Sequence, residues 1–165
     1  MELYVLRHGK AEKKIPAGGS DADRQLTSRG IKDVKKIAGW LRSSGILFDV
    51  IGTSPLVRAA DTAEIIATDL QNPHRPEVWE SLEPGGDPDR LKQDIRASGS
   101  EGPILIVGHE PMLSTLIGEL IADQGNARVI LRKGGLAMIS EIGNDEPLEG
   151  RLYLLIDPAR IKDWD

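Results

Sequence analysis

Cysteine is absent from the sequence, and so are long apolar runs and a surplus of basic residues. Without cysteine, disulfide bonds, thiolate chemistry and cysteine-type zinc sites are excluded, and a reducing compartment is favoured. No stretch approaches the roughly 18 apolar residues of a membrane helix, and Glu2 and Arg7 interrupt an initial run too short for a signal peptide. The net charge of -5 argues against nonspecific binding to nucleic acid. We therefore expect a cytoplasmic protein with no membrane or nucleic-acid partner.

The length and composition of the chain fit a small globular protein. Its 165 residues suit one domain that spans residues 1–165. Hydrophobic residues make up 39% and charged residues 28%, which is the balance of a soluble fold. No internal repeat, linker or low-complexity segment divides the chain.

Predicted strands and helices alternate along most of the chain. Short apolar runs indicate strands, and apolar residues at helical spacing indicate helices. Thr27 is a predicted N-cap, and Ser54 followed by Pro55 is predicted to begin the second helix. In chain order we expect a strand at Glu2–Leu6, a polar loop at Lys13–Gln25, a helix at Ser28–Ser43, a strand at Val50–Thr53, a helix that follows Ser54 and includes Leu70, a short strand at Glu77–Trp79, a helix at Pro88–Ala97, a strand at Ile104–Val107 and a helix at Pro111–Ala122.

The C-terminal part of the chain differs from this alternation. Leu136–Ile142 and Arg151–Leu155 are two strand-like runs joined by a short polar segment, which predicts a hairpin. Strand–helix alternation elsewhere favours a parallel sheet with helices on both faces. The predicted fold is therefore α/β, a three-layer α/β/α sandwich whose sheet is mostly parallel with an antiparallel C-terminal strand.

Cationic and imidazole side chains follow three of the predicted strands. Arg7 and His8 end the first, Arg58 lies shortly after the second, and His109 follows the strand at Ile104–Val107. Ligands of open α/β sheets bind at the carboxyl ends of the strands, so these side chains are expected to converge. Guanidinium groups match phosphate oxygens, and a neutral imidazole can attack phosphorus. The pattern predicts a phosphoryl-transfer site.

No metal or cofactor is expected at this site. The arginines can supply the positive charge that magnesium supplies in other phosphoryl-transfer enzymes. The sequence has neither a Walker-type loop nor a dinucleotide fingerprint. Aspartates near glycine and proline, Asp21 and Asp23 among them, more often form turns and caps than metal sites.

Four motifs in this order resemble those of the histidine phosphatase superfamily, which includes the cofactor-dependent phosphoglycerate mutases. They are "LRHGKAE", "LTSRG", "TSPLVRAADTAE" and "VGHEP". Two further stretches, "LEPGGD" and "GRLYLLIDP", resemble the compact SixA-type phosphohistidine phosphatases more specifically. The tripeptide Arg-His-Gly alone is a weak indication, whereas four ordered motifs that span nearly the whole chain are a strong one.

The resemblance implies a role for each residue of the predicted site. His8 is the nucleophile and is transiently phosphorylated on a ring nitrogen. Arg7, Arg58 and His109 bind the phosphate with it, and Gly9 lets the backbone turn close to the phosphate. Water then hydrolyses the phosphohistidine and releases inorganic phosphate. The fold that the resemblance implies, an α/β/α sandwich, agrees with the fold predicted above.

The sequence departs from the superfamily pattern at the general acid. Many members carry a glutamate that protonates the leaving oxygen, and the matching position falls near Ser81, flanked by Glu80 and Glu83. Glu83 is a candidate for this acid. An alkoxide depends strongly on such an acid, whereas an imidazole that leaves a phosphoramidate depends on it less. This departure favours phosphohistidine as the substrate.

These observations favour a metal-independent phosphatase that removes phosphate from phosphohistidine on a protein, such as a phosphotransfer domain or a phosphocarrier. The short chain leaves little for an insertion that would cover a small substrate, and we expect a monomer. Two alternatives stay open. One is a small-molecule phosphomonoesterase or mutase of the same superfamily, and the other is a non-catalytic module that binds phosphate.

Overall fold

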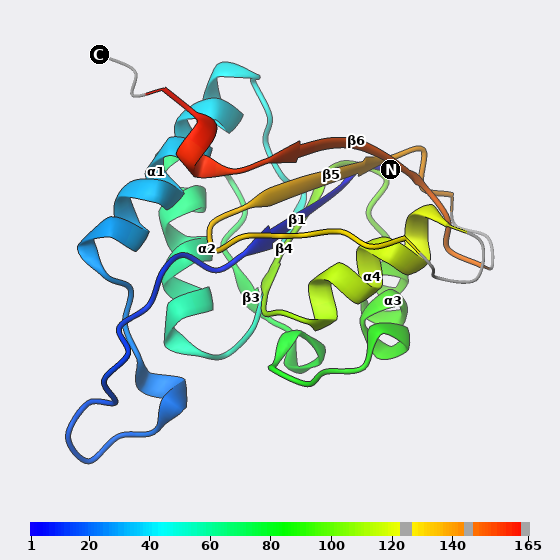
Figure 1. The fold of residues 1–165 in the computed structure, drawn as a ribbon. Coiled ribbons are helices and arrows are strands. Elements are labelled where there is room, and N and C mark those ends of the chain that lie inside the picture. The colour runs from blue at the N-terminus through cyan, green and yellow to red at the C-terminus, as the bar shows by residue number, and fades with distance from the viewer. Residues whose placement is uncertain (123–126, 144–146, 163–165) are drawn as a thin grey trace.

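A six-stranded mixed sheet lies between two layers of helices (Figure 1). The computed structural model describes residues 1–122, 127–143 and 147–162. Its sheet has the strand order β3-β2-β4-β1-β5-β6. The strands are β1 (Leu3–Arg7), β2 (Val50–Thr53), β3 (Glu77–Val78), β4 (Ile104–Gly108), β5 (Leu136–Ser140) and β6 (Arg151–Ile156). The helices are α1 (Ser28–Ser43), α2 (Val57–Asp69), α3 (Pro88–Ala97) and α4 (Met112–Ile121), with short 3-10 turns η1 (Asp21–Asp23), η2 (Glu80–Leu82) and η4 (Pro158–Arg160).

The α/β sandwich predicted from the sequence is confirmed, with one refinement in the sheet. β1, β2, β3 and β4 are parallel, whereas β5 is antiparallel to both of its neighbours, β1 and β6. The reversed strand is therefore β5, the first strand of the predicted hairpin. The last strand, β6, runs in the direction of β1.

Each face of the sheet is covered by one pair of helices (Figure 1). On one face α1 and α2 contribute apolar side chains to a cluster that includes Val34, Ile37 and Ile66. On the other, α3 and α4 contribute to a second cluster that includes Leu91 and Leu116. All five side chains are fully buried. Burial of apolar surface on both faces holds the central strands β1 and β4 rigidly in place.

The parallel register brings three strand ends to one edge of the sheet. Val107 of β4 lies opposite Leu6 of β1 on one side and Thr53 of β2 on the other. β5 begins at the same edge, because Leu136 pairs with Leu6. The segments that follow β1, β2 and β4, and the one that precedes β5, therefore meet there.

Several predicted boundaries move by a residue or two in the structure, and two of these changes bear on the site. β1 runs to Arg7, one residue beyond the predicted end, because Arg7 pairs with Gly108. α2 begins at Val57 with Leu56 as its N-cap, not at Ser54 and Pro55. The Ser54 hydroxyl accepts a hydrogen bond from the Leu56 N–H at 3.3 Å, which holds residues 54–56 in a turn ahead of the helix.

Two glycines allow the end of β1 to lie against the start of α1. A Cβ on Gly30 would lie 2.1 Å from the carbonyl oxygen of Lys10, and a Cβ on Gly9 would lie 2.8 Å from Cγ2 of Val34. Thr27 caps α1 by accepting the Gly30 N–H at 2.9 Å, and its own N–H donates to the Lys10 carbonyl at 2.8 Å. This packing fixes the segment that carries the predicted nucleophile.

Candidate active site

His8 is a buried side chain directly after β1. Its Nδ1 lies 2.7 Å from the carbonyl oxygen of Gly9. A carbonyl can only accept, so Nδ1 carries the ring proton and Nε2 keeps its lone pair. The His8 imidazole therefore has the tautomer that a nucleophile attacking through Nε2 requires.

Gly9 is itself held by the first turns of α2. Its N–H donates to Oγ1 of Thr62 at 3.1 Å, and that hydroxyl donates to the carbonyl of Arg58 at 2.7 Å. Thr62 is completely buried. The Gly9 N–H is thus bonded within the protein, and the close approach of Gly9 to Val34 explains why a residue without a side chain stands here. A direct role of Gly9 toward phosphate stays a prediction.

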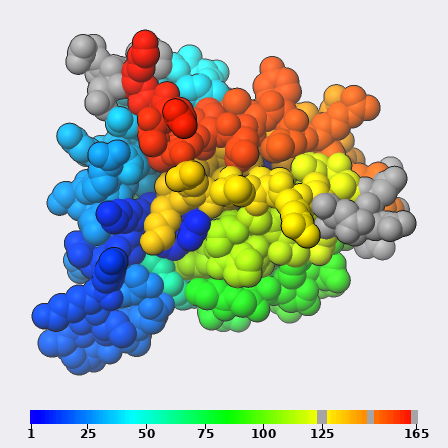
Figure 2. All heavy atoms as spheres, in the orientation of Figure 1, coloured from blue at the N-terminus to red at the C-terminus, as the bar shows by residue number. Residues whose placement is uncertain are grey.

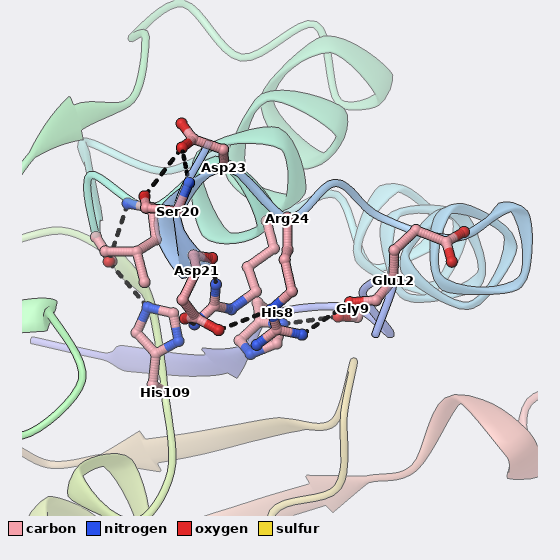
Figure 3. Close-up of polar contacts among 11 residues, drawn as sticks. His8, Gly9, Glu12, Ser20, Asp21, Asp23, Arg24 and His109 are labelled. Atoms are coloured by element: carbon pink, nitrogen blue, oxygen red, sulfur yellow. Dashed lines mark hydrogen bonds and ion pairs between the residues drawn. The ribbon is translucent and has the colours of Figure 1, made fainter. Parts of the chain in front are cut away.

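His109 follows β4 and is also buried. Its Nε2 lies 2.9 Å from the hydroxyl of Ser54. When that hydroxyl donates to Nε2, Nδ1 carries the proton of the neutral ring. Figure 3 shows this second nitrogen on the side of His8. Ser54 thus orients His109 so that an N–H faces the space beside His8.

The two imidazoles lie next to each other, with ring centroids 4.9 Å apart and planes tilted by 55°. Burial first, and then the charges of the nearby Arg58 and Arg7 guanidinium groups, lower the pKa of His8 to about 4, although the hydrogen bond to the Gly9 carbonyl opposes this shift. Burial, followed by the charge of His8, lowers the pKa of His109 to about 3. Both rings are therefore neutral at pH 7, so His8 is free to attack and His109 acts as a neutral donor.

These depressed pKa values predict a loss of stability in acid. Because the pKa of His8 is about 4 in the folded chain and ordinarily about 6.5, the unfolded chain takes up its proton first. Stability is then full above about pH 6.5 and is lost as the pH falls toward about 4. We expect the free energy of unfolding to fall by about 2 to 3 kcal/mol from this group between about pH 7 and pH 4.5.

Urea unfolding of wild type and His8→Asn at both pH values measures this contribution. Asparagine cannot titrate, so the variant should lose less stability than wild type over the same interval, with carboxylates contributing equally to both. An identical loss in the two proteins would show that His8 is not held neutral by the fold.

Arg58 is the second residue of α2 and is buried, with 4% of its surface exposed. Its guanidinium donates from Nη1 to the Asp21 carbonyl at 2.8 Å and from Nη2 to the Asp21 carboxylate at 3.0 Å. A pairing with Asp61, three residues along the helix, would be typical of an arginine on a solvated helix face. The structure instead joins Arg58 to a loop that lies 37 residues earlier in the chain.

Arg7 closes the cluster from the end of β1. Its Nη1 donates to the carbonyl of Leu131 at 3.0 Å. Nε of Arg7 and Nε of Arg58 are both buried and have no hydrogen-bond partner among the described residues. Buried N–H donors without an acceptor are costly, and an anion between the two side chains would satisfy them. The geometry therefore fits a phosphate.

The loop between β1 and α1 borders the cluster and stands out from the body of the protein, coloured blue in Figure 2. It carries η1, and Arg24 at its end donates to the Asp21 carboxylate at 2.8 Å and to the Glu12 carbonyl at 2.8 Å. Figure 3 shows Asp21 extending from η1 toward the two imidazoles. A second basic side chain, Lys133, precedes Gly134, whose N–H donates to the carbonyl of His8 at 3.0 Å.

Glu83, the candidate general acid, takes part in none of the contacts described above. Glu83 is exposed at the end of η2, and no hydrogen bond or ion pair of its side chain is found among the described residues. Ser81, the position that matches the superfamily acid, donates to Asp94 of α3 at 2.6 Å. The preceding Leu82 contacts the end of β4, where a Cβ on Gly108 would lie 3.2 Å from its side chain. A catalytic role for Glu83 stays a prediction.

The structure thus brings together the four side chains that the sequence singled out, namely Arg7, His8, Arg58 and His109. Sequence reasoning missed the partners that hold them. Ser54 was placed at the end of the second strand but only as a helix cap, Asp21 was expected to form a turn, and Thr62 was not considered. No signal in a single sequence connects Asp21 with Arg58, because the contact depends on how the loop folds back.

The described part of the chain offers no group of three histidine, aspartate or glutamate side chains able to hold a metal ion. Within the same residues, no helix is long and apolar enough to cross a bilayer.

Comparison with known proteins identifies the family. Residues 3–83 match the histidine phosphatase superfamily, branch 1. The phosphohistidine phosphatase SixA of Escherichia coli is 30% identical over 122 residues, which cover 73% of this chain and 74% of SixA. An uncharacterized protein of Picosynechococcus is 34% identical over 82% of each chain. A 2,3-bisphosphoglycerate-dependent phosphoglycerate mutase of Bradyrhizobium is 36% identical over 77 residues, 45% of this chain and 36% of the mutase.

A solved structure agrees with these sequence matches. SixA complexed with tungstate superposes with a TM-score of 0.86 at 26% identity, covering 98% of this chain and 100% of the other. The resemblance therefore extends over both helical layers and over the whole sheet edge that carries the paired imidazoles and arginines. The chain belongs to the histidine phosphatase superfamily and is a phosphatase of the SixA-like fold.

Proposed function

We propose that the protein is a metal-independent phosphatase that removes phosphate from phosphohistidine on another protein. The observation that carries this proposal is the hydrogen bond between Nδ1 of His8 and the Gly9 carbonyl at 2.7 Å. It presents Nε2 as a nucleophile beside two buried arginine Nε donors that have no partner among the described residues. Similarity to SixA, named as a phosphohistidine phosphatase, supports the substrate class.

In the first step, Nε2 of His8 attacks the phosphorus of the substrate. The new bond joins Nε2 to phosphorus, the bond from phosphorus to the leaving nitrogen breaks, and that nitrogen keeps the electron pair. Arg7 and Arg58 stabilise the charge on the transferred oxygens, and the N–H of neutral His109 donates to one of them. The tungstate bound by SixA is an oxyanion of the same kind as this phosphoryl group.

In the second step, water attacks the phosphorus and the bond to Nε2 breaks. His8 recovers its lone pair and its neutral form, while both protons of the water remain on the released dihydrogen phosphate. The depressed pKa of His8 favours this step, because the free imidazole is the stable form in the buried site. The site thus returns to its starting state without a further cofactor.

Two features favour a phosphoramidate over an ester. Ser81, near which the resemblance places the superfamily acid, is bonded to Asp94 and is not itself an acid that could protonate an alkoxide. Between α2 and β4 the chain holds only β3, η2 and α3, which leaves little of it to enclose a small molecule. A protein that displays phosphohistidine, such as a phosphotransfer domain or a phosphocarrier, is the substrate we propose.

The test compares phosphate release from a phosphohistidine protein and from an aryl phosphate by the wild-type enzyme, with EDTA present. We expect release from the phosphohistidine protein at a rate that chelation does not change. Hydrolysis of esters alone would identify a small-molecule phosphomonoesterase instead. Binding of phosphate without turnover of either substrate would identify a binding module.

A further inference from the structure

Asp21 is the one carboxylate of the described chain that bonds directly to a member of the predicted phosphate site. Its side chain is 58% exposed while that of its partner Arg58 is 5% exposed, so the pair joins the surface to the interior. Figure 3 shows the Asp21 carboxylate between the two imidazoles and the η1 backbone. Its negative charge opposes, to a smaller extent, the lowering of the pKa of His109 by burial.

The position of Asp21 corresponds to the leaving-group side of the reaction. Attacking and leaving atoms lie roughly in line through phosphorus. His8 attacks from the buried end of β1, so the leaving group lies toward solvent, where the half-exposed Asp21 stands. Arg58 uses two of its five N–H groups on Asp21, which leaves Nε and the remaining Nη protons for the phosphoryl oxygens.

Asp21 stays ionised near neutral pH. The hydrogen bond from Arg24, together with the charges of Arg58 and Arg24, lowers the pKa of this carboxyl below its usual range. An ionised carboxylate can accept a hydrogen bond from an N–H or O–H group but cannot protonate an alkoxide. Asp21 is therefore unsuited to act as the general acid that an esterase needs.

We propose that Asp21 selects phosphohistidine by accepting a hydrogen bond from the protonated second nitrogen of the substrate imidazole. That nitrogen keeps its proton throughout. When the bond between phosphorus and the first nitrogen breaks, its electron pair stays on the ring, and the substrate histidine leaves as neutral imidazole. The same carboxylate repels substrates whose leaving group is anionic, such as phosphorylated carboxylic acids. The inference rests on the proposed function and assigns its specificity to one residue.

The variant Asp21→Asn tests the charge with little change in shape. The amide oxygen can still accept from Arg58, and the backbone carbonyl of residue 21 still accepts from Nη1. Asp23→Asn is the matched control, because Asp23 lies in the same η1 turn and bonds only to Ser20, at 2.7 and 2.9 Å. Each protein is assayed on a phosphohistidine protein and on p-nitrophenyl phosphate.

We expect Asp21→Asn to lower the ratio of kcat/KM for phosphohistidine over the aryl phosphate by about tenfold or more, because a hydrogen bond to a charged group is lost on one substrate only. Inorganic phosphate should inhibit the variant several-fold more strongly, since a nearby negative charge is removed. Asp23→Asn should keep the wild-type ratio and the wild-type inhibition.

Several results would overturn the inference, and each has its own meaning. Equal losses on both substrates would show that Asp21 only holds Arg58 in place. The same shift in Asp23→Asn would show an effect of overall charge. If the wild type hydrolyses the aryl phosphate but no phosphohistidine, the proposed function fails and the inference fails with it. If the wild type is active on phosphohistidine and Asp21→Asn keeps the same ratio of kcat/KM for the two substrates, only the inference fails.

Discussion

Replacing His8 by alanine is expected to lower phosphate release from a phosphohistidine protein by a factor on the order of a thousand or more. The imidazole is the proposed site of the covalent intermediate, and no other side chain in the cluster can take its place. His109 uses Nε2 on Ser54 and follows a different strand. Arg7 and Arg58 carry no lone pair with which to attack phosphorus.

His74→Ala is the control for this measurement. His74 is exposed and lies in the loop between α2 and β3, outside the cluster. The His74→Ala variant should retain wild-type activity. Wild type mixed with substrate and quenched in alkali should yield an acid-labile phosphoenzyme that His8→Ala does not form. Turnover in His8→Ala close to that of wild type would remove His8 from its proposed role, whatever the arginines do.

Replacing Arg58 by lysine is expected to lower kcat/KM by about a hundredfold, although the positive charge is kept. The guanidinium holds Asp21 with two N–H groups, while its buried Nε has no partner among the described residues and stays available to an anion. A lysine ammonium is a single point of charge and cannot satisfy both sides. Competition by tungstate should weaken together with activity, because the same donors bind the ground-state oxyanion.

Arg75→Lys is the matched control, because Arg75 is an exposed arginine in the loop between α2 and β3 that also pairs with a carboxylate, Glu64. Its kinetics should equal those of wild type. Thermal melting of both variants separates a folding defect from a defect in the site. If Arg58→Lys keeps full activity, the two-sided use of the guanidinium is wrong, and charge alone is sufficient.

Much of the fold follows from local patterns in the sequence. Thr27 ahead of an amphipathic run predicts α1, and the structure begins that helix at Ser28 with the Thr27 side chain as its cap. The apolar run at Ile104–Val107 predicts a buried strand, and in the structure it forms the buried strand β4. These elements can be predicted from the sequence because helix capping and the periodicity of burial depend on residues a few positions apart. The start of α2 was placed too early, because a turn formed by Ser54 competes with the helix.

The identity of the site residues also came from the sequence. Arg7, His8, Arg58 and His109 stand at or just beyond strand ends, and parallel strands in one sheet bring such ends together. Chemistry at the level of residue type, a nucleophilic imidazole among guanidinium groups, needs no coordinates. The ordered motifs favoured the superfamily, and the match of residues 3–83 together with the 30% identity to SixA confirms it.

Only the tertiary structure decided how these residues are held and in which protonation state. The Asp21–Arg58 pair spans 37 positions and the Ser54–His109 contact spans 55. Such contacts depend on how the loop before α1 and the turn before α2 fold against the sheet, and no local pattern encodes this. The low pKa values of His8 and His109 arise chiefly from burial. Burial belongs to the packed molecule as a whole, which is why the sequence identifies the imidazoles while the fold makes them neutral.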